Sequence, residues 1–212
     1  MSPSRPVAPE LAAVQVDGMS RQAFLMRATL AAGATYGATM ATPFITRALA
    51  KEGGGDVAIL NFALTLEYLE ATFYTMAVKQ VRGLSADEMK LAKKLRDDET
   101  EHVDALTATI KQLGGKPVAK PAFDFGGAFA SRAAFLKTAN TLEDTGVSAY
   151  NGAAPHIASK QVLGAAGGIV QVEARHASLV RLARSKPPAP AAFDKPSERS
   201  SVLAAVKPLI KA

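Results

Sequence analysis

Residues 99–102 of the chain read Glu-Thr-Glu-His, and residues 173–176 read Glu-Ala-Arg-His. Each stretch has a glutamate and a histidine three positions apart, Glu99 with His102 and Glu173 with His176. Residues three apart on a helix lie on one face, so each pair can point at a single ligand. The two stretches therefore indicate two helices that carry the same chemistry.

A second motif precedes each of these stretches. Glu67 is followed seven residues later by Tyr74, and Glu143 is followed seven residues later by Tyr150. Seven residues make nearly two helical turns, so each glutamate shares a face with its tyrosine. The glutamates of the two motifs are 32 residues apart in the first half (67 to 99) and 30 in the second (143 to 173). This repeated order predicts two similar helical hairpins.

The remaining pattern predicts an all-α chain, because apolar residues recur at helical spacing from residue 56 onward. Ser85 and Glu88 form a capping box at the start of the second helix, and Gly114 ends that helix. The predicted helices span 56–81, 85–113, 130–154 and 159–184, and a short last helix spans 197–210.

The connection over residues 115–128 is rich in Pro, Gly and Phe. A helix of ~27 residues is ~40 Å long at 1.5 Å per residue. Fourteen extended residues reach roughly 46–50 Å, so this connection can cross the bundle from end to end. The sequence therefore predicts a four-helix bundle with one long crossover connection between two hairpins. A loose loop of the same length is the alternative.

The inward faces of these hairpins place four carboxylates and two imidazoles at one level of the core. Ionised carboxylates cannot stay unpaired in an apolar core, so the site needs either protonation of all four or bound cations. Two divalent ions balance four carboxylates, and a carboxylate and imidazole set suits iron or manganese, as two Fe, two Mn or a mixed pair. The predicted metal ligands are Glu67, Glu99, His102, Glu143, Glu173 and His176.

Several neighbouring residues need an interpretation. Tyr74 and Tyr150 either have a role at the predicted metal site or are plain core aromatics. Glu70, one turn after Glu67, is interpreted as a solvent or interface charge, with an extra ligand as the alternative. His156 follows Pro155 at a helix end and is interpreted as structural.

Two further groups carry open expectations. One of the acids beside the motifs (Asp98, Glu101 and Asp144) could hold the far nitrogen of a ligand histidine. Three glycines in the fourth helix (Gly164, Gly167 and Gly168) cost helix stability. Close approach of a neighbouring helix would explain these glycines, and a flexible entry to the site is the alternative.

Composition excludes several classes of function. Cysteine is absent, so disulfide frameworks, zinc knuckles and thiol catalysis are excluded. The net charge of +6 is not arranged as a basic stripe with aromatic residues, so we expect no nucleic-acid partner. The partners we expect are metal ions and O2 or H2O2, and a homo-oligomer is compatible with the pattern.

Residues 1–50 form a separate region. No acidic residue occurs between Gly18 and Lys51, and the uncharged stretch 28–46 is followed by the small-residue site Ala48-Leu49-Ala50. This pattern predicts an export signal, with an extra N-terminal helix as the alternative. Weak hydrophobicity disfavours a permanent membrane span. We therefore expect a periplasmic or extracellular location. The rest of the chain is expected to form the bundle over 56–184 and a Pro-rich tail with a short helix over 185–212.

The motifs resemble those of the ferritin-like superfamily, and especially its exported bacterial ferritin-like-domain branch, which is related to desiccation-associated proteins. The resemblance covers about residues 56–184 and the tail through residue 210, and the runs 150–155 and 173–177 carry it beyond the ligands. It implies that Glu99 and Glu173 bridge the metals and that Glu67 and Glu143 are terminal ligands. It also implies that each histidine gives one nitrogen ligand and that Tyr74 and Tyr150 orient carboxylates or pass electrons. The segment that reads Ser-Arg-Gln-Ala-Phe-Leu at 20–25 looks like a twin-arginine signal, although Gln22 replaces the second arginine.

Three functions fit this reading. The first is an oxidoreductase of oxidative or desiccation stress, with ferroxidase, peroxidase or catalase-like activity at a di-metal site. The second is a non-catalytic metal-binding stress or interaction protein, and the third is iron storage or sequestration. Turnover of peroxide by the metal-loaded protein would distinguish the first from the second.

Overall fold

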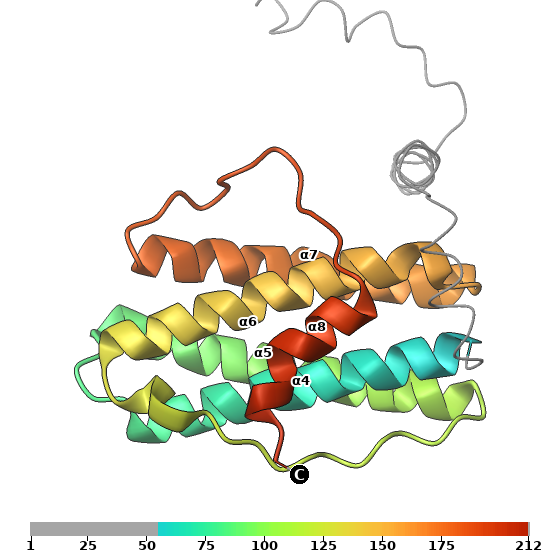
Figure 1. The fold of residues 1–212 in the computed structure, drawn as a ribbon, viewed down its shortest axis with the longest axis horizontal. Helices are drawn as coiled ribbons and strands as arrows, with labels where there is room; N and C mark the ends of the chain where they lie inside the picture. Colours follow the sequence, from blue (N-terminus) through green and yellow to red (C-terminus); the bar gives the residue numbers. More distant parts are fainter. Residues whose placement is uncertain (1–54, 212) are drawn as a thin grey trace, which may run out of the picture. The chain divides into compact units, whose positions relative to one another are not determined.

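The computed structural model describes residues 55–211. Its four long helices are α4 (Gly55–Gln80), α5 (Ala86–Gln112), α6 (Arg132–Ala153) and α7 (Lys160–Ala183). They pack as two hairpins, α4 with α5 and α6 with α7, which meet through α4 against α6 and α5 against α7 (Figure 1). The predicted all-α four-helix bundle is confirmed. The predicted export signal lies outside the described residues.

The helix ends follow from local sequence signals. Ser85 and Glu88 form the predicted capping box at the start of α5, and their side chains satisfy backbone N–H groups reciprocally. Ser131 and Ser159 cap α6 and α7 in the simpler way, each accepting one backbone N–H three residues on. Gly114, which follows α5, has φ of +75°, a left-handed conformation typical of glycine at a helix exit.

Two apolar clusters fill the bundle. Cluster A contains Leu69, Phe73, Leu95, Phe135 and Val180, which come from the last half of α4, the first half of α5 and of α6, and the last half of α7. Cluster B contains Leu60, Leu64, Ile110, Tyr150 and Val162, from the opposite halves of the same helices. On α5 and α7 the buried polar residues of the motifs lie in sequence between the two clusters, and on α4 and α6 the motif glutamates lie near the boundary between them. The bundle therefore has a polar layer between two apolar ones.

The connection from α5 to α6 crosses the bundle from end to end. The last turns of α5 pack in cluster B, whereas α6 begins in cluster A. Along the connection, Val118 packs against cluster B, and Phe125 is buried in cluster A just before the short 3-10 helix η1 (Gly126–Phe129). Asn61 on α4 holds the connection through the carbonyl of Lys116 and the N–H of Val118. The predicted crossover is confirmed (Figure 1).

The C-terminal segment returns to the bundle and contains the predicted short last helix. After the 3-10 helix η2 (Ala154–His156) and α7, the chain forms α8 (Arg199–Val206) and η3 (Lys207–Leu209). Val202 and Val206 are buried in cluster A, and the N–H of Asp124 donates to the carbonyl of Leu209 at 2.9 Å. Figure 1 shows α8 crossing the bundle beside α6. Among the described helices, none is both long enough and apolar enough to cross a bilayer.

Candidate metal centre

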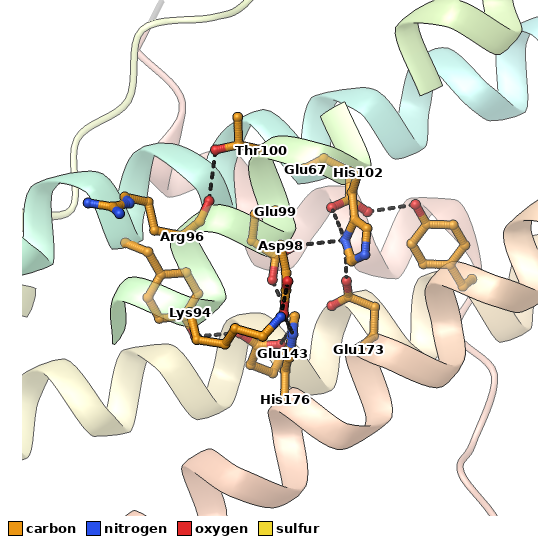
Figure 2. Close-up of polar contacts among 12 residues, drawn as sticks. Glu67, Lys94, Arg96, Asp98, Glu99, Thr100, His102, Glu143, Glu173 and His176 are labelled. Atoms are coloured by element: carbon orange, nitrogen blue, oxygen red, sulfur yellow. Dashed lines mark hydrogen bonds and ion pairs between the residues drawn. The ribbon is translucent and has the colours of Figure 1, made fainter. Parts of the chain in front are cut away.

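The four long helices each deliver part of one buried polar cluster. Glu67 comes from α4, Glu143 from α6, and the two Glu-x-x-His pairs come from α5 and α7 (Figure 2). All four of these glutamates are 0% exposed, and the two histidines are 8% and 3% exposed. The structure thus brings together all six residues that the spacing singled out, namely Glu67, Glu99, His102, Glu143, Glu173 and His176.

The six residues form two overlapping groups of possible ligand atoms. One group consists of Glu67, Glu99, Glu173 and His102, and the other consists of Glu99, Glu173, Glu143 and His176. Within each group one atom from every residue lies within 4.8 Å of the others. Glu99 and Glu173 belong to both groups, so each could contact two ions, whereas the other four residues each belong to one.

The histidines turn Nδ1 toward the carboxylates. His102 Nδ1 lies 2.9 Å from Glu99 Oε2, 3.0 Å from Glu173 Oε1 and 3.3 Å from Glu67 Oε2 (Figure 2). His176 Nδ1 lies 2.8 Å from Glu99 Oε1 and 3.5 Å from Glu143 Oε2. Three carboxylates around one nitrogen cannot all accept its single hydrogen. The geometry is that of ligand atoms converging on a common point.

These contacts set the charge of the histidines in the metal-free cluster. Burial lowers the pKa of His102, but contacts with Glu173, Glu67 and Glu99 outweigh it and raise the pKa to about 12. His176 has the same balance, with Glu143 and Glu99 as its partners, and its pKa rises to about 11. Without a metal, protonated imidazoles therefore supply the positive charge that the carboxylates require.

The carboxylates differ among themselves. Burial raises the pKa of Glu67 to about 7 and raises the pKa of Glu173 well above its usual range, where the nearby charge of Glu99 adds to the shift. Burial also opposes ionisation of Glu99, but the two approaching imidazoles outweigh it and lower the pKa to about 2. Glu99 is thus the carboxylate that carries its charge most firmly between the two histidines.

Each tyrosine reaches across to the other hairpin. The Tyr150 hydroxyl on α6 donates to Glu67 Oε1 at 2.6 Å, and the Tyr74 hydroxyl on α4 donates to Glu143 Oε1. Burial raises the pKa of both phenols well above the usual value, and the acceptor carboxylates add to the shift. Tyr74 also packs edge-on against Phe73, with ring centroids 5.2 Å apart. Both interpretations of the tyrosines therefore hold: they are core aromatics whose hydroxyls orient carboxylates.

Asp98 is the acid that holds the far nitrogen of a histidine. His176 Nε2 lies 3.0 Å from Asp98 Oδ2, and Asp98 also pairs with Lys94 on the surface (Figure 2). Such a partner fixes the tautomer and ring orientation of a ligand histidine. Of the other two candidates, Glu101 is exposed, and Asp144 contacts Asn140 and Arg181 instead.

The structure corrects the interpretation of Glu70. It was expected to be a solvent or interface charge, but it is only 2% exposed, and its Oε1 lies near Gly146 of α6 and the Glu173 carboxylate. Burial and the neighbouring glutamates raise its pKa well above the usual range. One signal in the sequence could have placed Glu70 in the core. The second copy of the motif has a glycine, Gly146, at the position that matches Glu70.

The structure also corrects the expectation that a neighbouring helix approaches the glycines of α7 closely. A Cβ on Gly164, Gly167 or Gly168 would meet nothing within 4 Å among the described residues, so no helix of this part of the chain approaches them closely. Close approach is found instead at Gly146 on α6. His156 lies in η2, away from both ligand groups.

The residues of the cluster fit metal ions. Several buried atoms have no hydrogen-bond partner among the described residues, although an imidazole and a carboxylate approach each other at some of them: Glu67 Oε2, Glu70 Oε2, Glu99 Oε1, Glu143 Oε2, both carboxylate oxygens of Glu173, and His176 Nδ1. Buried polar atoms without partners are costly, and cations would satisfy all of these at once. Carboxylate and imidazole donors suit iron and manganese. The cluster could therefore hold metal ions, and two overlapping ligand groups are suggestive of a di-metal site.

Comparison with known proteins agrees with this geometry. Residues 55–186, more than half of the chain, match a family described as the ferritin-like domain. A search of curated proteins found no match. The matched range contains the four long helices and every residue of the two ligand groups. The chain therefore belongs to the ferritin-like domain family.

Proposed function

We propose that this protein is a di-metal carboxylate oxidoreductase that holds iron or manganese and reacts with O2 or H2O2. The observation that carries the proposal is the pair of buried ligand groups that share Glu99 and Glu173. Two sharing carboxylates would hold two ions close together, so that one small oxidant could contact both. Ferroxidase, peroxidase and catalase-like activities all belong to this chemistry.

The bound ions would supply the electron exchange with oxygen or peroxide. The chain supplies position and environment. Tyr74 and Tyr150 donate hydrogen bonds that hold one oxygen each of Glu143 and Glu67, leaving the other oxygen free for an ion. Asp98 accepts from His176 Nε2, which leaves the Nδ1 lone pair of that ring free for an ion. Clusters A and B cover the polar layer from both ends and exclude bulk water from it.

The first test is the metal content of the purified protein, measured by elemental analysis beside a Glu99→Ala, Glu173→Ala double variant. About two iron or manganese ions per chain, lost in the variant, is the expected result for residues shared by two ions. Glu101→Gln is the matched control, because Glu101 is an exposed acid on the same helix as Glu99. No bound metal after reconstitution with Fe²⁺ and with Mn²⁺ would refute the proposal.

A second measurement separates catalysis from simple binding. The metal-loaded protein is mixed with O2 and with H2O2, and consumption of each is followed together with the metal's oxidation state. Turnover supports the oxidoreductase. A protein that holds two ions but consumes neither oxidant would be a non-catalytic metal-binding protein.

We also propose that the protein acts outside the cytoplasm, in oxidative or desiccation stress, as members of the exported bacterial branch are expected to do. The support is the sequence pattern of residues 1–50, with its acid-free stretch and the small-residue site at 48–50. Cell fractionation with N-terminal sequencing of the mature protein tests it. A cytoplasmic protein that retains residue 1 would refute this part.

A further inference from the structure

Glu70 is a buried carboxylate that is not one of the six predicted metal ligands. It is 2% exposed, and its Oε2 has no hydrogen-bond partner in the described part of the chain. An unpaired carboxylate in such a place is costly, so its presence in the core requires a compensating interaction. After burial, the groups that raise the pKa of Glu70 are the glutamates Glu173, Glu99, Glu143 and Glu67, whose negative charge disfavours an ionised carboxylate beside them.

The two tyrosine hydrogen bonds show where Glu70 lies along the bundle. Tyr150 reaches Glu67, and Tyr74 reaches Glu143, so α4 and α6 run antiparallel with these pairs opposite each other. Residue 70 is three positions after Glu67, and residue 146 is four positions before Tyr150. Glu70 therefore lies opposite Gly146, midway between the two cross-hairpin hydrogen bonds.

Gly146 is the reason that Glu70 fits there. A Cβ at residue 146 would lie 3.1 Å from Glu173 Oε2 and 3.3 Å from Glu70 Oε1. Both distances are shorter than ordinary van der Waals contact, so a side chain at this position would displace the two carboxylates. The space over Gly146 is thus filled by Glu70 and Glu173 together. Both Oε2 atoms are among the buried oxygens without a partner.

Glu70 also lies on a particular side of the cluster. The histidines come from α5 and α7, whereas Glu70 belongs to α4 and faces α6. Its neighbour Glu173 is one of the two residues common to both ligand groups. The α4–α6 side of the cluster therefore has a carboxylate of its own, beside a glutamate that could contact both ions.

We infer that Glu70 is a further metal ligand of the centre, which binds iron or manganese from the α4–α6 side beside Glu173, in the space that Gly146 leaves open. This inference rests on the proposed function. It gives the centre five glutamates and two histidines. Two divalent ions bring four positive charges against five negative ones, so the fifth carboxylate stabilises a higher oxidation state of one ion.

The test uses Glu70→Gln and Gly146→Ala in the full-length protein, with Glu101→Gln as the exposed control of equal charge change. Mn²⁺ affinity is measured by calorimetry, and the visible spectrum of the Co²⁺-loaded protein reports its coordination. We expect Glu70→Gln to weaken Mn²⁺ binding by ~10–100-fold and to change the Co²⁺ spectrum. Its iron-loaded form should show a more positive midpoint potential, and Glu101→Gln should change none of the three.

Gly146→Ala keeps every carboxylate but intrudes on the space that Glu70 and Glu173 share, so it should alter the same Co²⁺ spectrum. A crystal structure of the unaltered, Mn²⁺-loaded protein decides the matter even if Glu70→Gln does not fold. A Glu70 oxygen bonded to an ion is the expected result, and a Glu70 carboxylate outside bonding distance overturns the inference.

The two proposals fail separately. If the protein binds two ions and Glu70→Gln binds them with unchanged affinity, spectrum and potential, the role of Glu70 is wrong and the di-metal site stands. If the unaltered protein binds no metal, both are wrong, because Glu70 then has no ion to contact.

Discussion

The α4–α5 half and the α6–α7 half of the centre repeat one motif, and two of the differences between them concern acids that contact the cluster. Glu70 in the first half corresponds to Gly146 in the second, and Asp98 corresponds to Val172. The shared residues build a scaffold with nearly matched ligands from both hairpins. The two differences add a carboxylate on one side and a carboxylate partner for His176, and Val172 offers no such partner for His102. A nearly symmetric framework would therefore give the two proposed metal positions different surroundings.

The largest expected effect is on metal content. It should distinguish the ligands that both metal positions share from the ligands that belong to only one position. Glu99→Gln or Glu173→Gln removes a residue common to both groups and should reduce metal content toward zero. Glu67→Gln or Glu143→Gln alters a single group, so each variant should keep about one ion per chain. Elemental analysis beside a helicity check by circular dichroism measures this. Equal loss in all four variants would mean that the two positions fill only together.

Metal uptake should depend steeply on pH. In the metal-free cluster the pKa of His102 is raised to about 12 and that of His176 to about 11, so both rings are protonated at neutral pH. An ion bound at Nδ1 must displace these protons, so metal affinity should rise with pH, by about tenfold per pH unit for each proton released. Calorimetry in buffers of different ionisation enthalpy counts the protons. Uptake without proton release would show that the histidines do not bind the ions through Nδ1.

The free energy of unfolding of the metal-free protein should depend on pH in the opposite direction, and should fall as pH rises. A raised pKa in the folded state means that the contribution of His102 and His176 is fully present below their unfolded pKa of ~6.5. That contribution is lost as pH rises toward 11 and 12. Urea unfolding of the metal-free protein at pH 6 and pH 10 checks this, and His102→Gln should flatten the difference.

Asp98→Asn should make the two halves more alike. Loss of the carboxylate removes the charged partner of His176 Nε2 and should weaken the ion bound to His176 by ~10–100-fold, with little effect on the ion bound to His102. Two-site calorimetry resolves the two affinities, and Asp104→Asn is an exposed control on α5. An equal loss at both positions would contradict the assignment of Asp98 to one of them.

Tyr74→Phe and Tyr150→Phe form a matched pair with a smaller effect. Each leaves a buried carboxylate oxygen without its donor, which should lower the free energy of unfolding of the metal-free protein by ~1–3 kcal/mol. Both variants should still bind two ions, because the hydroxyls contact ligands and not ions. Urea unfolding and elemental analysis test the two statements, and loss of metal would assign the phenols a direct role.

The smallest effect compares two glycines. Gly168→Ala on α7 should stabilise the protein by up to ~1 kcal/mol, because alanine favours helix and a Cβ there meets nothing among the described residues. Gly146→Ala should instead destabilise the packing around Glu70 and Glu173. Thermal unfolding of both variants measures the contrast. A destabilised Gly168→Ala variant would indicate that residues outside the described range, or a second protein molecule, pack against α7.

Spacing along the chain was sufficient to predict the bundle, its crossover and the six clustered residues. The reason is that a helix converts intervals of three and seven residues directly into shared faces. The glutamates and histidines of the motifs therefore had to lie on inward faces of two hairpins. The capping box at Ser85 and the glycine exit at Gly114 fixed the ends of α5 in the same local way.

Contacts between hairpins could not be predicted, because they depend on how α4 and α6 pass each other. Which carboxylate each tyrosine reaches, and which acid holds His176, are decided by residues far apart in sequence. Glu70 shows the limit most clearly. One turn from Glu67, it could face solvent or the core, and only the open space over Gly146 on another helix places it inside. Local periodicity determines which face a residue shares, while tertiary packing decides what that face meets.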